Sequence, residues 1–144
     1  MQIYNTNFEI SMRILLLLNS FDYPLDLEEI KTIDILSTYS KQYGISDVNL
    51  HGDSTYSVSE ISARHELINA ALKHLTIQGQ IKMISTEQGF VYEITDIGKT
   101  ICNKMTSDYS KEYRNSVLST KLFISDKSKK EIRNLIYKVF MRRD

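Results

Sequence analysis

Apolar residues recur at helical spacing along most of the chain, beginning with residues 8–20. These are apolar on nearly every side, which predicts a helix in the centre of the fold, because a peripheral helix keeps a polar face toward water. A second helix is expected over residues 26–39, where Asp26 and Glu29 have the spacing of a reciprocal capping pair. Its apolar face consists of Leu27, Ile30, Ile33, Leu36 and Tyr39.

Residues 41–56 lose this periodicity and contain two glycines, so we predict a long loop. Loops of this length inside compact domains often carry function. A third helix is expected over residues 57–78, since Ser57 and Glu60 form another capping pair and Gly79 suits the position after the last turn.

The spacing changes to alternation over residues 81–94, where the runs IKMIS and FVYEI flank the turn TEQG. Alternating apolar residues around a turn closed by glycine predict a β-hairpin. Helical spacing returns at Ile97, and we expect a fourth helix that is capped by Thr95 or Asp96 and reaches about Ser119.

A last helix is expected after Ser128, which has Glu131 as its capping partner. Its apolar stripe consists of Ile132, Leu135, Ile136, Val139 and Phe140. Seven cations accompany the stripe, namely Lys127, Lys129, Lys130, Arg133, Lys138, Arg142 and Arg143. Such a helix can fold back on the domain, bind DNA or lie in a groove of a partner. We expect the stripe to pack on the domain or a partner, with the cations facing a carboxylate-rich surface.

Charge is balanced overall but unevenly distributed. The chain of 144 residues has 18 basic and 18 acidic side chains, yet residues 1–60 carry a net charge of −6 and residues 126–144 a net charge of +4. The single cysteine, Cys102, fits a reducing compartment and is expected to be buried. The longest aliphatic run, residues 14–18, is far shorter than a membrane span, and we expect a cytoplasmic protein.

Catalytic motifs are not recognisable in the sequence. His65 and Glu66 begin the run HELIN, which has Asn69 where a zinc-protease helix needs its second histidine. The run HGDSTYS lacks the strand and glycine elbow of a serine nucleophile, and neither common phosphate-binding glycine pattern occurs. We therefore expect no enzyme activity, no cofactor and no metal site.

The predicted order of elements describes a winged helix-turn-helix, and the runs LTIQGQI and ITDIGK resemble the entry to and exit from the wing of small winged-helix proteins. We predict a mainly α fold with a small β-hairpin: a winged-helix domain over residues 1–121, with its wing at about 81–94, and a C-terminal amphipathic helix over residues 122–144.

The third helix is a poor match to duplex DNA. It offers Arg64 and Lys73 against Glu60 and Glu66, and the tip of the wing carries a carboxylate without a cation. Since phosphate contacts supply most non-specific affinity, we favour a protein-docking module. A winged-helix transcription regulator is the alternative.

Most of the chain resembles the middle component of ABC-three-component systems, which include the Lamassu type of bacterial anti-phage defence. The likeness lies in the runs FEISMRILLLLNSFDYPLDLEEIKTIDILSTYSKQYG, NLHGDSTYSVSE, RHELINAALKHL and GFVYEITDIGKTIC. The resemblance implies a non-enzymatic bridge between an SMC-like ABC ATPase and an effector, often a nuclease. DNA would then be contacted through the complex, and no membrane is involved.

Several residues are candidates for the partner interface. Asp34 interrupts the apolar face of the second helix and occupies either a solvated or capped position or the interface, and Arg64 is the best candidate for a charged contact. Arg13 is expected to pair with Glu9 or with another acidic residue instead. The long loop adds Asn49, His51, Asp53 and Tyr56, although His51 could equally pair with a neighbouring carboxylate. The last helix adds Leu135, Ile136, Arg142 and Arg143.

Overall fold

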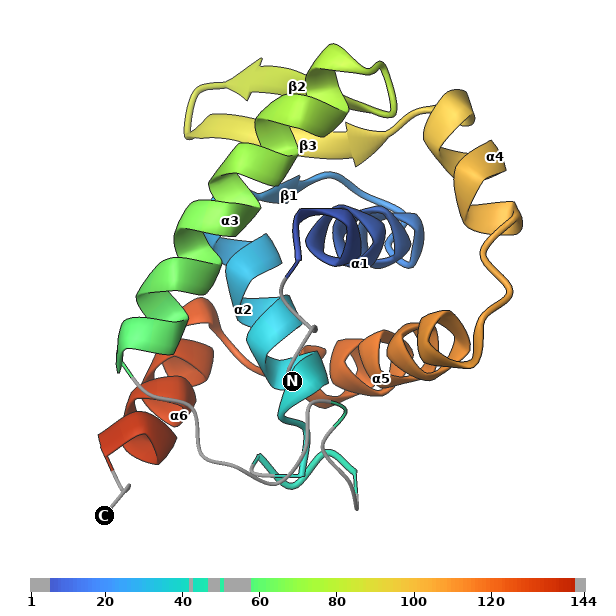
Figure 1. Cartoon of the computed structure of the whole chain (residues 1–144). Coiled ribbons are helices and arrows are strands. Elements are labelled where there is room, and N and C mark those ends of the chain that lie inside the picture. Colours follow the sequence, from blue (N-terminus) through green and yellow to red (C-terminus); the bar gives the residue numbers. More distant parts are fainter. Residues whose placement is uncertain (1–5, 42, 47–49, 51–57, 142–144) are drawn as a thin grey trace.

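The structure, a computed structural model, describes residues 6–41, 43–46, 50 and 58–141, apart from the side chains of residues 58–61 and 139–141. The described part contains six helices and a three-stranded antiparallel sheet (Figure 1). Along the chain these are α1 (Asn7–Asn19), β1 (Leu25–Asp26), α2 (Leu27–Thr38), α3 (Val58–Ile77), β2 (Ile81–Thr86), β3 (Gly89–Ile94), α4 (Asp96–Asn103), α5 (Asp108–Ile124) and α6 (Lys129–Met141).

Helix α1 runs through the middle of the molecule, as predicted. It contacts α2, α3, α4, α5 and strand β3, and these elements enclose it in the view of Figure 1. Ile10 and the five consecutive residues 14–18 are all buried. An all-round apolar surface therefore has a neighbour on every side, which is why this sequence forms the central helix.

The predicted caps of α2 and the predicted end of α3 are confirmed. The Asp26 carboxylate accepts the Glu29 N–H at 2.8 Å, and the Glu29 carboxylate accepts the Asp26 N–H at 2.9 Å. After α3, Gly79 takes a left-handed φ of 75°, which lets the Gln80 N–H reach the Leu75 carbonyl at 3.0 Å.

The predicted hairpin forms from β2 and β3, in a register that pairs Ile81 with Ile94 and Thr86 with Gly89. The sheet also has a third strand that the sequence did not predict. Leu25 and Asp26 form β1, which pairs with the edge of β3 that faces away from β2 and gives the sheet order β1-β3-β2. A strand of two residues has no periodicity of its own, so only the position of β3 reveals it.

The predicted fourth helix is two helices. The first, α4, begins at the predicted Thr95 cap, where the hydroxyl accepts the Gly98 N–H at 3.2 Å. The chain leaves the helical conformation before Ser107, whose hydroxyl accepts the Ser110 N–H at 3.1 Å and so begins α5. This corner sends α5 back to pack on α1 and α2. The predicted domain boundary after residue 121 lies within α5.

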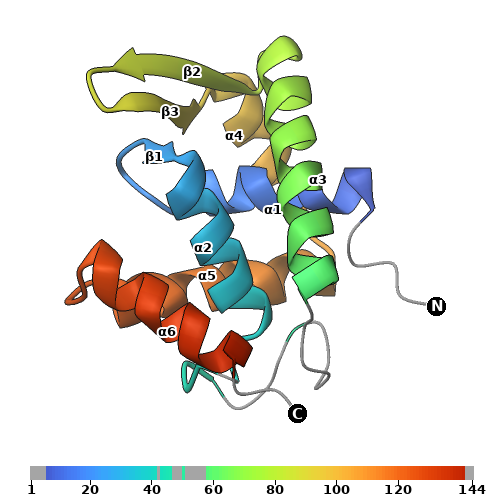
Figure 2. The ribbon, with the colours of Figure 1, turned by 90° about the vertical axis from the view of Figure 1, so that its left-hand side faces the viewer.

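Helix α6 packs on the domain through the described part of its apolar stripe, Ile132, Leu135 and Ile136. Ile132 is buried in a second core cluster that it shares with residues of α2 and of the segment after it: Ile35, Leu36, Tyr39 and Tyr43. Leu135 and Ile136 are partly buried against the same cluster, and Figures 1 and 2 both show α6 next to α2. The Ser128 cap is confirmed, since its hydroxyl accepts the Glu131 N–H at 3.1 Å.

Candidate functional site

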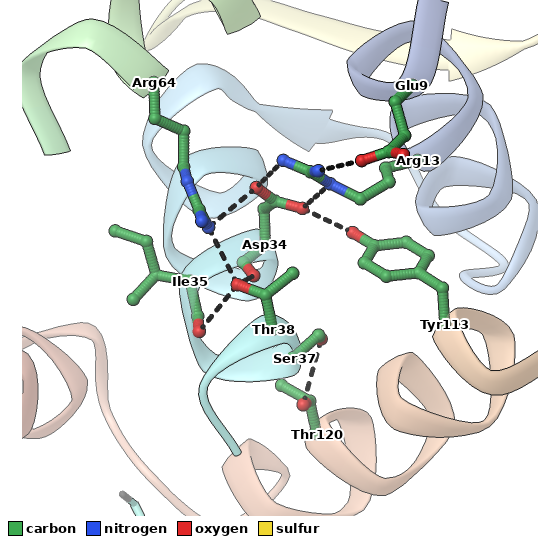
Figure 3. A network of polar contacts seen from close by, with 9 residues as sticks. All are labelled: Glu9, Arg13, Asp34, Ile35, Ser37, Thr38, Arg64, Tyr113 and Thr120. Carbon is green, nitrogen blue, oxygen red and sulfur yellow. Dashed lines mark hydrogen bonds and ion pairs between the residues drawn. The ribbon is translucent and has the colours of Figure 1, made fainter. Parts of the chain in front are cut away.

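Asp34 stands at the centre of a buried polar network in which four helices meet (Figure 3). Arg13 of α1 binds both carboxylate oxygens, with Nε 2.9 Å from Oδ1 and Nη2 3.0 Å from Oδ2. Arg64 of α3 donates from Nη1 to Oδ2 at 3.2 Å, and the Tyr113 hydroxyl of α5 donates to Oδ1 at 2.7 Å. The carboxylate on α2 is thereby tied to the other three helices.

Further contacts extend the network on both sides. Arg64 Nη1 also donates to the Thr38 hydroxyl at 2.7 Å, and that hydroxyl donates to the Asp34 carbonyl at 2.8 Å. The Arg64 guanidinium lies 5.3 Å from the centre of the Tyr39 ring. On the other side, Arg13 Nη1 lies 3.5 Å from a carboxylate oxygen of Glu9, so the predicted pair is confirmed. With Glu9 ionised, two carboxylates balance two guanidinium groups.

The network stabilises its charged form. Burial alone would raise the pKa of Asp34, but the positive charges of Arg13 and Arg64 outweigh it and hold that pKa well below its ordinary value. Burial raises the pKa of Tyr113 far above its ordinary value, and the neighbouring Asp34 charge raises it further. Asp34 therefore stays ionised and Tyr113 stays a hydrogen-bond donor at any physiological pH.

This arrangement is suited to holding helices together rather than to chemistry. Asp34 is 2% exposed, and its two oxygens already accept hydrogen bonds from three side chains. A substrate would have no approach to the carboxylate, and a proton would find its acceptor sites occupied. Elsewhere in the described residues, no group of three or more His, Cys, Asp or Glu side chains could hold a metal ion.

The structure places the two best charged candidates inside the domain. The prediction that Asp34 is solvated was wrong, because its carboxylate is buried and bound by Arg13, Arg64 and Tyr113. The Arg64 guanidinium is 1% exposed, which does not fit a charged contact with a partner. Leu135 and Ile136 face the second core cluster. The remaining candidates, Asn49, His51, Asp53, Tyr56, Arg142 and Arg143, lie outside the described residues.

Sequence reasoning missed Tyr113 and Thr38 as members of the network. The available signal was that three charged residues, Arg13, Asp34 and Arg64, stand at positions where their helices are otherwise apolar. Buried charges need partners, so these three could have been assigned to one another. A tyrosine or threonine gives no comparable signal, because both residue types are common in cores and on surfaces.

Two exposed apolar surfaces lie apart from the network. A groove of about 600 Å³, here called the α1–α3–α4 groove, is lined mainly by apolar side chains that include Met12, Ala70, Ile101 and Met105. Phe8, at its rim, is 79% exposed. On α5, Leu118 and Leu122 lie one turn apart and are both exposed. Exposed apolar side chains that group together often mark contacts with other proteins.

Cys102 is buried, as predicted. Burial raises the pKa of its thiol to about 11, so the side chain stays a neutral thiol rather than a reactive thiolate. None of the described helices combines the length and apolar character needed to cross a membrane.

Comparison with known proteins gives one assignment. No curated protein and no solved structure matches the chain. The family model for the ABC-three component (ABC-3C) system Middle Component 2 matches residues 3–143, almost from end to end. The chain belongs to this middle-component family of ABC-three component systems.

Proposed function

We propose that this middle component is a non-enzymatic bridging subunit of a bacterial anti-phage or anti-plasmid defence complex, related to the Lamassu type. In this proposal it works in the cytoplasm and links an SMC-like ABC ATPase to an effector that is a nuclease. The observation that carries the proposal is the family match over residues 3–143, since a middle component of a multi-component system needs protein partners.

The described surface supports a role in binding rather than catalysis. The charged residues of the core are engaged with one another. Two separate surfaces expose apolar side chains that group together, the α1–α3–α4 groove and the Leu118–Leu122 face of α5. A bridge needs two docking surfaces that can be occupied at the same time. We propose that one of these surfaces binds the ATPase and the other binds the effector.

We also propose that α1, α2, α3 and the sheet form a winged helix used for docking. The chain runs α1-β1-α2-α3-β2-β3, and β1 pairs with the second strand of the hairpin, which is the order expected of that fold. Duplex reading is disfavoured because Glu66 accompanies Lys73 on the exposed side of α3, and the hairpin turn carries Glu87 without a cation. The regulator alternative therefore has less support.

Co-purification with the other subunits of the same system tests the bridge. We expect both the ATPase and the effector to co-purify with a tagged form of this chain. Exchanging Leu118 and Leu122 for Asp should release one of the two, and exchanging Phe8 and Ile101 for Asp should release the other. Circular dichroism of each variant shows whether it has folded.

Two results would contradict the proposal. One is an ATPase and an effector that bind each other directly and leave the chain behind. The other is loss of both partners, or of neither, from two folded surface variants. A nanomolar, sequence-specific duplex complex of the isolated chain would instead support the transcription regulator.

A further inference from the structure

Helix α6 presents a polar, cationic face on the side away from its apolar stripe. The face consists of Lys130, Arg133, Asn134, Tyr137 and Lys138, all of them exposed. Tyr137 is 64% exposed, which is unusual for an aromatic ring. Among the described residues, no ion pair involves Lys130, Arg133 or Lys138, whereas Lys129 at the edge of the face pairs with Asp26 at 3.2 Å.

This face borders an open groove of about 590 Å³ between α2, α3 and α6, here called the α2–α3–α6 groove. Arg133, Asn134 and Tyr137 line one wall, Lys31 lines the wall formed by α2, and His65 lines the wall formed by α3. Figure 1 shows the first turns of α3 next to α6. Cations, an amide and an aromatic ring thus converge on one concave surface.

The apolar side of α6 is already occupied by its own domain. Ile132 is 9% exposed, and Leu135 and Ile136 pack against the same cluster. A basic amphipathic helix that docks in a partner's groove would need this stripe to be available. Since these three residues pack on the domain, with Ile136 also lining the groove, the part of the described α6 surface that remains for a ligand is mainly the cationic face.

The local charge favours a polyanion. Lys31 and Arg133 line the groove against a single acidic lining residue, Glu28. Lys130 and Lys138 are exposed and lie one helical turn from Asn134 on α6. The pKa of His65 agrees with a positive local charge, because burial lowers this pKa and the positive charge of Lys31 lowers it further. The imidazole is therefore neutral at pH 7 and can both donate and accept a hydrogen bond.

We propose that the α2–α3–α6 groove binds single-stranded nucleic acid directly. Phosphates would lie against Lys130, Arg133 and Lys31, and an unpaired base would stack on the Tyr137 ring, with Asn134 and His65 as hydrogen-bonding groups. Proteins that bind single strands combine a cationic track with aromatic platforms in this way. This inference goes beyond the bridging function and does not depend on it.

Single strands fit this surface better than either alternative. Stacking on Tyr137 requires a base with a free face, which a duplex does not offer. An acidic protein segment could satisfy the cations, but it would give no role to an exposed ring beside them. DNA and RNA share the chemistry described here, so the experiment has to compare them.

Fluorescence anisotropy of the whole chain with labelled oligothymidylate and oligouridylate of about 12 nucleotides tests the proposal. We expect micromolar binding at low salt, with weaker binding of a duplex of the same length. Tyr137→Ala should weaken binding about tenfold without changing its salt dependence. Exchanging Lys130 and Arg133 for Gln should reduce the slope of log Kd against log salt by about 1.4, as expected for two lost phosphate contacts.

The matched control exchanges Lys99 and Lys104 for Gln. Both are exposed and lie at α4, on the other side of the molecule from α6 (Figure 1), so the net charge changes equally while the groove is untouched. We expect this variant to bind like the parent. All the exchanged side chains are exposed, and thermal unfolding monitors whether each variant is folded.

Three outcomes would overturn the proposal. Equal weakening by the α4 variant would mean that only net charge matters. An unaffected Tyr137→Ala variant, or displacement of the oligonucleotide by polyglutamate at equal charge, would show a surface for an acidic protein. Tighter binding to the duplex than to either single strand would show a different mode of recognition.

Discussion

The Asp34 carboxylate shows how one residue can hold four helices together. Removing a carboxylate from water is costly, and the cost is recovered only when its oxygens are fully engaged by opposite charge and hydrogen-bond donors. Here Arg13, Arg64 and Tyr113 provide that engagement. The network as a whole adds little net stability, but removing its carboxylate is costly, because two guanidinium groups are then left buried together.

We predict that Asp34→Asn lowers the free energy of unfolding by about 3–5 kcal/mol. The amide keeps the shape of the side chain but removes the charge that Arg13 and Arg64 surround. Urea denaturation followed by circular dichroism measures the change. Asp22→Asn is the control, since Asp22 is exposed and should change stability by less than about 0.5 kcal/mol. Similar midpoints for the two variants would contradict a central role for Asp34.

The low pKa of Asp34 also predicts how stability depends on pH. The ordinary value is 3.8 and the folded value is lower, so below pH 3.8 the unfolded chain binds a proton that the folded chain does not. Stability from this residue is therefore complete above that pH and is lost as the pH falls, by up to about 1.4 kcal/mol per pH unit. Glu9 acts in the opposite direction, because burial raises its pKa.

Urea midpoints measured between pH 7 and pH 3 test this dependence. Sucrose in all samples keeps the Asp34→Asn variant folded. We expect the variant to lose less stability than the parent below pH 4, because it lacks the titrating group. Parallel pH curves would show that Asp34 is not held in its charged form.

The charged members of this network could be recognised individually in the sequence, but most of their contacts with one another could not be predicted. Arg13 and Glu9 are one helical turn apart, and their pairing follows from local geometry alone. Asp34 is separated by 21 residues from Arg13, by 30 from Arg64 and by 79 from Tyr113. Contacts over such distances depend on how whole helices pack, which periodicity does not determine.

At the scale of elements, the junction between the hairpin and α4 depends on close backbone contact. A Cβ at position 98 would collide with the Gln80 carbonyl oxygen and would lie 2.6 Å from Ile94 Cγ1. The Gln80 carbonyl cannot easily move, because it accepts the Thr95 N–H at 3.1 Å. Gly98 therefore allows the first turn of α4 to lie directly against the start of the sheet.

We predict that Gly98→Ala destabilises the protein, although alanine favours helices. The gain in helix propensity is about 1 kcal/mol, whereas crowding a closely packed site costs about 1–3 kcal/mol and more where backbone must shift. Thermal unfolding should show a lower midpoint. Lys99→Ala, at an exposed neighbouring position, should leave the midpoint nearly unchanged. A more stable Gly98→Ala variant would show that α4 can move away at little cost.

The elements that sequence reasoning located correctly are those with local signals. The caps at Asp26, Thr95 and Ser128 need only residues within one turn, and the hairpin needs only alternation and a glycine. Strand β1 was missed because it exists only through its pairing with Tyr92 and Val91. The break between α4 and α5 was missed because apolar residues continue at helical spacing through Met105 and Tyr109.

At the scale of the whole molecule, α6 covers a surface that the rest of the domain cannot cover. We predict that a chain ending at Ser125 has a free energy of unfolding lower by at least about 2 kcal/mol, because Ile35, Leu36 and Tyr39 lose the contact with Ile132. Urea denaturation measures this as a lower midpoint. Lys129→Gln is the control, since the exposed pair with Asp26 contributes about 0–1 kcal/mol. If the shortened chain were as stable and still assembled with its partners, α6 would be dispensable.

The central position of α1 has a consequence for biosynthesis. The most apolar helix leaves the ribosome before the elements that enclose it, and these elements extend to α5, which ends at Ile124. Until α5 has been made, residues 14–18 lack part of their neighbours and form an exposed apolar segment that is prone to aggregation. Folding of this domain therefore has to wait until α5 has been synthesised, and chaperone dependence should be greatest for nascent chains that stop before α5.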